Sequence, residues 1–198
     1  MKKADETANA ARIKRIVAAC NVIPNVFWSV LNLTPISVFC YRCIDWKTFG
    51  YFLIVSLLSA ILPKAFFNNI LPGKTPAFYR KTGVAFINRF TQNGDIINKF
   101  VRKRFPGYKA ISQRQNGIYK AIQQTYMLEK FHFVVFLFFF FVIIYALKNN
   151  YARWAIIIAL NNIIYNIYPC LLQQYIRIRL ESTRTKRKKP RNIAPLII

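Results

Sequence analysis

The feature that most constrains the fold is the apolar run at residues 131–147, in which His132 is the one side chain that titrates near neutral pH and which holds neither proline nor glycine. At a rise of 1.5 Å per residue, a helix of this length spans about 25 Å, close to the roughly 30 Å thickness of a bilayer's hydrocarbon core. The run therefore predicts a membrane-spanning helix.

Three further apolar blocks can be assessed in the same way. Residues 46–66 and 154–172 are each about 20 residues long and predict two more spans, although Pro169 and several asparagines interrupt the later block. Residues 16–39 are diluted by Pro24, Pro35 and polar side chains, so this block either spans the membrane or only enters it.

The basic residues indicate how many blocks cross. The chain has 30 Lys and Arg residues against 6 Asp and Glu. If all four blocks span, 26 of the 30 fall on one side and 4 on the other, which is the asymmetry of a protein whose basic side faces the cytoplasm. The sequence therefore predicts an all-α membrane protein with four transmembrane helices and both termini in the cytoplasm.

The chain is then one membrane domain, residues 1–198. Its parts are a basic N-terminal arm (1–15), a first helix pair (16–62), a cytoplasmic interfacial segment (63–130), a second helix pair (131–173) and a basic tail (174–198). In the interfacial segment, apolar and basic residues alternate at helical spacing after Asp95 and predict a basic amphipathic helix in the membrane interface. Such a helix either only adheres to the membrane or also binds a phosphorylated substrate.

Glu129 and His132 are three residues apart at the start of the most apolar run, so a helix places them on one face. A carboxylate there can orient the imidazole and raise its basicity, which makes His132 a candidate general base for an alcohol at the membrane surface. Two other interpretations stay open. One is an interfacial histidine beside a helix-start glutamate, and the other is half of a di-iron Glu-x-x-His motif, of which the chain has no second copy.

The last apolar block carries a second set of polar residues. Asn162, Asn166, Gln173 and Arg177 are separated by 4, 7 and 4 residues, so a regular helix aligns them in one stripe that reaches the cytoplasmic surface. Such side chains either bond neighbouring helices or bind a polar ligand. Arg177 and Arg179 lie where a phosphate would be met, and positive-inside anchoring explains them equally well.

The cysteines do not predict a metal site. Cys40 and Cys43 have zinc-like spacing, but a zinc site needs two more ligands and the only histidine is far away in sequence. The pair either forms an external disulfide or stays as two thiols.

Together these motifs resemble those of the small bacterial membrane acyltransferases typified by glycosyl-diaponeurosporenoate acyltransferase of staphyloxanthin-type carotenoid synthesis. The resemblance covers roughly residues 60–180. It rests on the Glu-x-x-His before an apolar helix, the acidic turn at Asp95, and the Asn-x-x-x-Asn-x-Tyr-Pro helix that leads into Leu-Gln-x-Tyr-x-Arg-x-Arg-Leu. Two positions depart from the family pattern, Ile176 where the family has Asn and Phe133 where it has Trp.

The resemblance implies transfer of a fatty acyl group from a thioester, acyl coenzyme A or acyl carrier protein, to a sugar hydroxyl of a membrane glycolipid or glycosyl-terpenoid. It implies a location in the bacterial cytoplasmic membrane and no bound cofactor. The implied catalytic residues are Glu129, His132 and Asp95. The implied substrate-binding residues are Asn162, Asn166, Gln173, Tyr175, Arg177 and Arg179.

Three other functions fit parts of the sequence. A non-catalytic adaptor would use the basic run at residues 184–191 to hold anionic lipid or a partner protein. A transporter would need paired charges inside the spans, and the apolar blocks contain none. Binding to nucleic acid would account for the charge, yet no base-stacking platform or soluble domain accompanies it.

Overall fold

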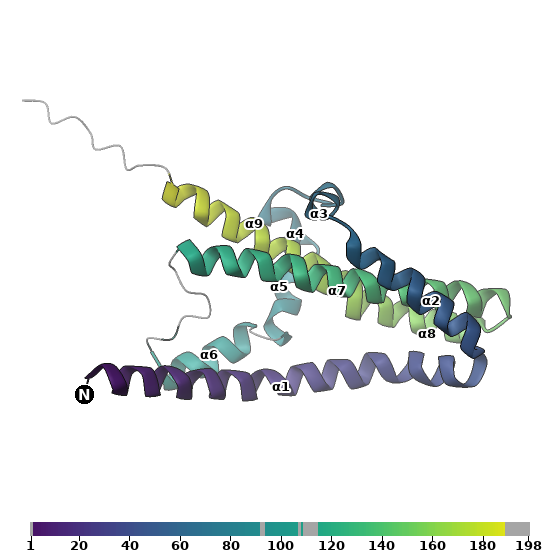
Figure 1. Cartoon of the computed structure of the whole chain (residues 1–198), viewed down its shortest axis with the longest axis horizontal. Coiled ribbons are helices and arrows are strands. Elements are labelled where there is room, and N and C mark those ends of the chain that lie inside the picture. Colours follow the sequence, from purple (N-terminus) through teal and green to yellow (C-terminus); the bar gives the residue numbers. More distant parts are fainter. Residues whose placement is uncertain (1, 92–93, 107, 109–114, 189–198) are drawn as a thin grey trace, which may run out of the picture.

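The structure is a computed structural model that describes residues 2–91, 94–106, 108 and 115–188. Within these ranges it consists of helices without strands (Figure 1), which confirms the predicted all-α class. The long helices are α1 (Lys2–Cys43), α7 (Gln115–Lys148) and the continuous pair α8 (Ala152–Asn162) and α9 (Tyr168–Lys188), which a π turn at Ile163–Ile167 joins. The shorter helices are α2 (Trp46–Leu58), α3 (Lys64–Asn69), α4 (Pro76–Lys81), α5 (Val84–Ile87) and α6 (Asp95–Arg104).

Three helices are long and apolar enough to cross a membrane, namely Ala11–Cys43, Asn116–Lys148 and Ala152–Thr185. The block at residues 16–39 therefore lies in one continuous helix that accommodates both of its prolines. The block at residues 46–66 forms only the shorter apolar helix Trp46–Ile61. Its predicted extension to Phe66 is wrong, because the residue before Pro63 is held in an extended conformation and α3 begins after this break.

Asp45 starts α2 immediately after α1 ends. Its Oδ1 accepts hydrogen bonds from Lys47 N at 3.1 Å and Thr48 N at 3.0 Å, which satisfies two amides at the helix N-terminus. These bonds hold the pKa of the Asp45 carboxyl below its usual range. The sharp turn brings α2 back along the bundle formed by α7, α8 and α9 (Figure 1).

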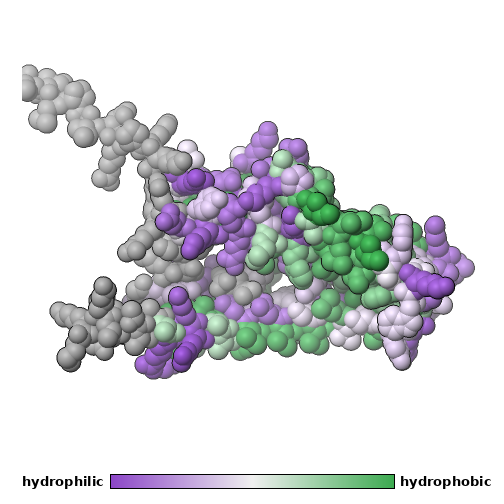
Figure 2. Space-filling model, in the orientation of Figure 1, coloured by the Kyte–Doolittle hydropathy of each residue, from purple (hydrophilic) through white to green (hydrophobic). Residues whose placement is uncertain are grey.

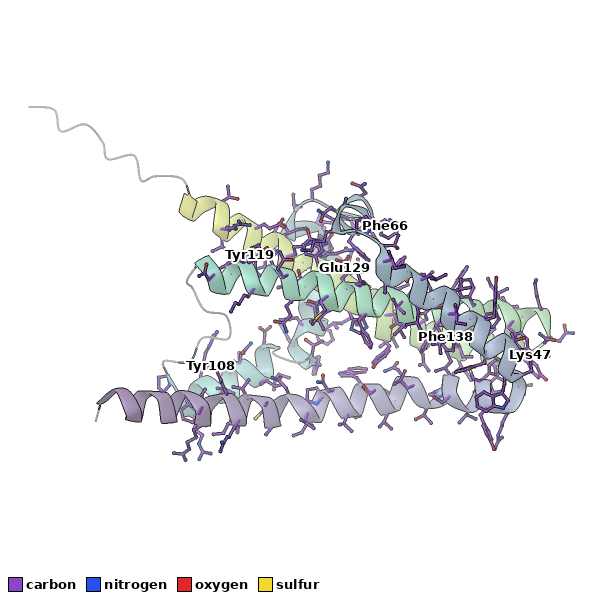
Figure 3. The ribbon with its side chains drawn as sticks, viewed as in Figure 1. Lys47, Phe66, Tyr108, Tyr119, Glu129 and Phe138 are labelled. Carbon is purple, nitrogen blue, oxygen red and sulfur yellow. The ribbon has the colours of Figure 1, made fainter. Side chains whose placement is uncertain are left out.

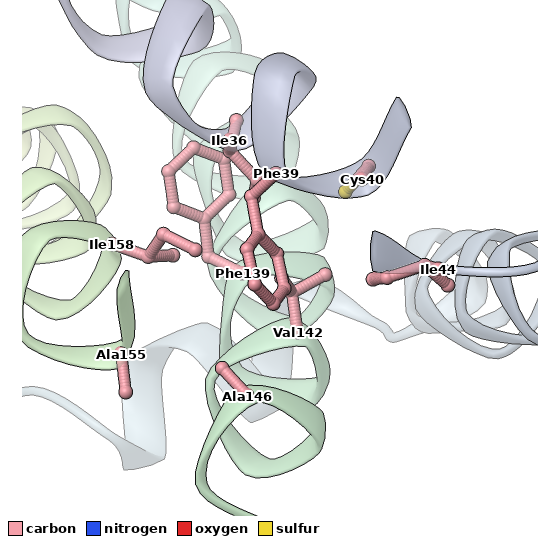
Figure 4. Close-up of a cluster of buried hydrophobic side chains, with 9 residues drawn as sticks. All are labelled: Ile36, Phe39, Cys40, Ile44, Phe139, Val142, Ala146, Ala155 and Ile158. Carbon is pink, nitrogen blue, oxygen red and sulfur yellow. The ribbon is translucent and has the colours of Figure 1, made fainter. Parts of the chain in front are cut away.

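The C-terminal end of α1 joins this bundle in an apolar core (Figure 4). Phe39, Phe139 and Ile158 are almost completely buried there. Ala146 and Ala155 allow the backbones of α7 and α8 to approach closely, which favours helix packing in a membrane. The core residues are Ile36, Phe39, Cys40, Ile44, Phe139, Val142, Ala146, Ala155 and Ile158.

The segment between α2 and α7 covers the other end of the bundle. Tyr79 of α4 and Val84 of α5 are fully buried against Leu172 and Tyr175 of α9. The predicted amphipathic helix is present as α6, which lies beside α1 (Figure 1). Gln92 and Asn93 of the predicted turn before it lie outside the described residues, as does the basic tail beyond residue 188.

The surface has an apolar band between two hydrophilic ends (Figure 2). Lys47 marks one end and Tyr119 lies toward the other (Figure 3). Large apolar side chains along α1, such as Ile23 and Phe27, are more than half exposed. Lipid tails are the natural surroundings of such a band, so the chain is a membrane protein.

Candidate active site

A cavity of about 1510 Å³ lies between α1, the α5–α6 segment and the helices α7 and α9. Ligand pockets commonly measure roughly 300–1,000 Å³, so this one has room for two reactants. Most of its lining side chains are apolar or aromatic. In the part of the chain that the structure describes, its titratable acidic and basic lining groups are Asp95, Arg102, His132 and Arg179.

Two hydrogen bonds hold the middle of α1 at this cavity. Ser29 Oγ and Tyr165 OH are 3.1 Å apart. Trp28 Nε1 donates to the carbonyl oxygen of Phe90 at 3.2 Å. Both Ser29 and Trp28 line the cavity, so α1 forms one of its walls although its main packing contacts with the bundle lie farther along, at its C-terminal end.

His132 lies on the opposite wall, near the middle of α7. Its ring meets the Tyr165 ring edge to face, with centroids 5.8 Å apart, and lies against the Asn166 side chain. His132 Nδ1 and Asn166 Oδ1 are buried and lack a hydrogen bond of good geometry to any described residue. The imidazole is thus half-buried, with one edge on the protein interior and access to the cavity.

Glu129 does not orient His132, which corrects the sequence-based pairing. Its Oε1 accepts a hydrogen bond from Gln174 Nε2 at 2.6 Å, and its Oε2 forms an ion pair with Arg177 Nη1 at 2.5 Å. Both charged side chains are 1% exposed. The carboxylate therefore faces α9 from the middle of α7 (Figure 3), away from the cavity wall.

Tyrosines extend this buried ion pair toward α3 and α4. The Arg177 guanidinium stacks over the Tyr126 ring at 4.1 Å, and Tyr126 OH donates to Asn68 Oδ1 at 2.7 Å. Tyr79 OH donates to Gln174 Oε1 at 3.2 Å and also contacts the Gly73 carbonyl at 3.0 Å. Burial is the main reason that the pKa of Tyr79 is raised, so this hydroxyl stays a neutral donor.

Gln174 is part of this network, although the sequence pattern pointed to Gln173, and a π turn separates both glutamines from the asparagines of the predicted stripe. Pro169 has no N–H, and its ring excludes the carbonyl of the preceding turn. The chain widens into a π turn at Ile163–Ile167, which shifts the register of the residues that follow by about one position. Gln174 and Arg177, three residues apart on α9, share its buried face, and Gln173 lies on the cavity wall.

The predicted polar stripe is therefore divided. Asn166 Nδ2 donates to Asn162 Oδ1 at 2.8 Å, and Asn162 Nδ2 donates to the Phe136 carbonyl at 3.3 Å, so these amides join α8 to α7. Of the remaining predicted residues, Asp95, Gln173, Tyr175 and Arg179 line the cavity with His132. Arg179 Nη1 lies 3.4 Å from Tyr175 OH. Glu129 and Arg177 are buried behind this wall.

Sequence reasoning missed Ser29, Tyr165, Gln174, Tyr79 and Tyr126. It also found no paired charges inside the spans, whereas Glu129 and Arg177 pair within two helices that are long enough to span. Their separation of 48 residues hides the pair in the sequence. One signal in the sequence could have indicated the pair, because a carboxylate in a membrane helix requires a cation nearby.

Replacing Tyr79 with phenylalanine is expected to lower stability by about 1–3 kcal/mol, because the buried Gln174 oxygen and Gly73 carbonyl lose their donor. Thermal unfolding of the detergent-solubilised protein measures this change. Tyr119→Phe is the matched control, since Tyr119 is 49% exposed. Equal thermal unfolding midpoints for Tyr79→Phe and Tyr119→Phe would show that the Tyr79 hydroxyl does not bridge α4 and α9.

Comparison with known proteins adds one finding. The model of a family described as glycosyl-4,4'-diaponeurosporenoate acyltransferase matches residues 63–186. The match begins after α2 and includes α3 to α9 down to residue 186, so it contains the Glu129 network and every cavity wall except α1. No curated protein and no solved structure matches the chain.

Proposed function

Because the chain belongs to the glycosyl-4,4'-diaponeurosporenoate acyltransferase family, we propose that it transfers a fatty acyl group from a thioester to a sugar hydroxyl of a glycosyl-carotenoid. The observation that carries the proposal is the position of His132, the only histidine of the chain, on the wall of a large cavity that lies among the membrane helices. A neutral imidazole is the side chain best suited to take a proton from an alcohol near neutral pH.

The reaction balances without a covalent enzyme intermediate. A ring nitrogen of His132 takes the hydroxyl proton while the sugar oxygen attacks the thioester carbonyl carbon. The new C–O bond forms, the C–S bond breaks, and the imidazolium returns the proton to the departing thiolate. The products are a sugar ester and a free thiol.

Two hydroxyls that line the cavity with His132 are suited to stabilise the oxyanion that develops on the carbonyl. Tyr165 OH and Ser29 Oγ are hydrogen bonded to each other, and the Tyr165 ring contacts the imidazole. A donor fixed before the reaction stabilises developing charge without reorganisation. The Asp95 carboxylate lines the same cavity from α6 and can accept hydrogen bonds from the other sugar hydroxyls.

Glu129 and Arg177 act as positioning residues in this proposal. Their ion pair fixes α9 against α7, and the backbone carbonyl of Glu129 also accepts a hydrogen bond from Cys170 Sγ at 3.6 Å. His132 lies one turn after Glu129 on α7, and its ring contacts the ring of Tyr165, which lies just before α9. The pair thus sets the relative position of the imidazole and the hydroxyl donors.

The charge distribution supports one orientation of the site in the membrane. The end of the bundle that carries α6 and the end of α9 is rich in basic residues, which supports an orientation with this end toward the cytoplasm and a location in the bacterial cytoplasmic membrane. His132 belongs to a helix that is long and apolar enough to span the membrane, where a carotenoid dissolved in the bilayer can reach it. An adaptor that only binds anionic lipid at its surface does not require a cavity among the helices.

Expression in a bacterial host that makes glycosyl-4,4'-diaponeurosporenoate tests this function. Mass spectrometry of extracted pigments should show a new species heavier by one fatty acyl group, which alkaline hydrolysis converts back to the starting glycoside. The empty vector is the control. Unchanged pigments in membranes that contain the inserted protein would overturn the proposal.

A further inference from the structure

We propose that the cavity binds the phosphopantetheine arm of the thioester donor, with Arg179 and Arg102 holding its phosphate and His132 adjoining the thioester. This inference rests on the proposed function and names its donor. Coenzyme A and acyl carrier protein present the same arm, a thiol joined through two amides to a phosphate. The geometry points to this chemistry for three reasons.

The first reason is the position of the cations. Arg179 comes from α9 and Arg102 from α6, and both line the cavity. On α6, Asp95, Asn98 and Arg102 have the spacing of one helix face, and all three line the cavity. Guanidinium groups bind phosphate through parallel charge-assisted hydrogen bonds, and two of them from facing helices form a clamp.

The second reason is the length of the cavity wall. Along the bundle axis, His132 lies at the position of Tyr165, because their rings are in contact. The Arg179 guanidinium lies at the position of Tyr175, because its Nη1 is close to Tyr175 OH. Ten residues of helix separate Tyr165 from Tyr175, a rise of about 15 Å. A pantetheine arm has about as many bonds as four to five peptide units, and it therefore reaches roughly 15 Å when extended. A phosphate held at Arg179 thus places the thioester beside His132.

The third reason is the lining between these ends. Gln124 and Thr125 of α7 and Gln173 of α9 line this stretch among apolar side chains such as Leu128 and Leu172. The two amides of the pantetheine arm need hydrogen-bond partners once they leave water, and Gln124 and Gln173 offer both donors and acceptors. An acyl chain alone would require no such groups.

A binding cycle with two ligands tests the phosphate contact without requiring turnover. The purified protein in lipid nanodiscs is titrated with 4'-phosphopantetheine and with pantetheine, which differ only in the phosphate. The parent should bind the phosphorylated ligand at least about tenfold more tightly, since charge-assisted hydrogen bonds to phosphate are strong. Arg179→Gln should reduce this ratio at least about threefold, through weaker binding of 4'-phosphopantetheine, and Arg102 accounts for the preference that remains.

Arg184→Gln is the matched control, because it removes one positive charge from the same helix at a residue that stacks on Tyr119 and does not line the cavity. Arg184→Gln should keep the parent's ratio of affinities for 4'-phosphopantetheine and pantetheine. The small long-range effect of its lost charge should disappear at high salt. Equal binding of the two ligands by the parent, or the same loss in both variants, would overturn the inference.

Measurements of acyl transfer then show whether coenzyme A or acyl carrier protein supplies the arm. They also distinguish a failure of the phosphate site from a failure of the proposed acyltransferase function. Palmitoyl coenzyme A, palmitoyl acyl carrier protein and the palmitoyl thioester of N-acetylcysteamine, which lacks phosphate, are compared as donors. Arg179→Gln should raise KM about tenfold or more for whichever phosphorylated donor the parent uses and leave KM for the truncated thioester unchanged. A parent that uses all donors with equal KM contradicts the phosphate site, whereas a parent that transfers from none contradicts the acyltransferase function itself.

Discussion

Replacing Arg177 with methionine is expected to destabilise the protein by about 3–5 kcal/mol, because the Glu129 carboxylate is then buried without its charge partner. Glu129→Gln should be damaging for the reciprocal reason, since the Arg177 guanidinium loses its counter-charge. The double variant Glu129→Gln/Arg177→Met should lose less stability than the sum of the two single variants, because no unpaired buried charge remains.

Unfolding in mixed micelles of increasing denaturing detergent, followed by circular dichroism, measures these differences. Arg184→Met is the control, as it removes a basic side chain that lies on α9 outside the ion pair. Its effect should stay within about 0.5 kcal/mol, as expected of a substitution near the surface. If Arg177→Met proves as stable as this control, the ion pair does not hold α7 and α9 together.

Replacing His132 with alanine is expected to lower kcat for acyl transfer by about 100- to 10,000-fold, the usual contribution of a general base. The pigment product should fall below detection while the protein still inserts at the parent level. His132→Asn should be equally inactive, because an amide keeps polarity at this position without accepting the proton. Binding of 4'-phosphopantetheine should be unchanged in both variants, since Arg179 and Arg102 are untouched.

Met127→Ala is the control for His132. Met127 lies five residues earlier in α7, is 63% exposed and does not line the cavity. Its transfer rate should match the parent. Activity of His132→Ala within a few-fold of this control would exclude His132 as the base and shift attention to Asp95, the carboxylate that lines the same cavity from α6.

The sequence predicted the helical class and the apolar helices because burial in lipid imposes a strong compositional pattern. It placed Asp95, His132, Gln173, Tyr175 and Arg179 among the candidate residues, and the structure brings these five to one cavity. Helical spacing selected His132 and Gln173, whereas Asp95 and Tyr175 became candidate site residues through the family resemblance.

The sequence could not predict the partner of Glu129. Spacing of three residues favoured His132, but a buried carboxylate gains most from a cation, and Arg177 approaches only through the packing of α9 on α7. The π turn before Pro169 also separates both glutamines from the asparagines of the predicted stripe. A one-residue register shift leaves no mark in an apolar helix pattern, so the division of the polar stripe required the structure.

Stoichiometry with the purified protein tests the central claim most directly. The parent in nanodiscs receives palmitoyl coenzyme A and glycosyl-4,4'-diaponeurosporenoate, and released thiol and carotenoid ester are measured in the same sample. The account predicts one thiol for each ester with the parent protein, and neither product above background with His132→Ala. Thiol release without ester, or ester formation that persists in His132→Ala, would contradict it.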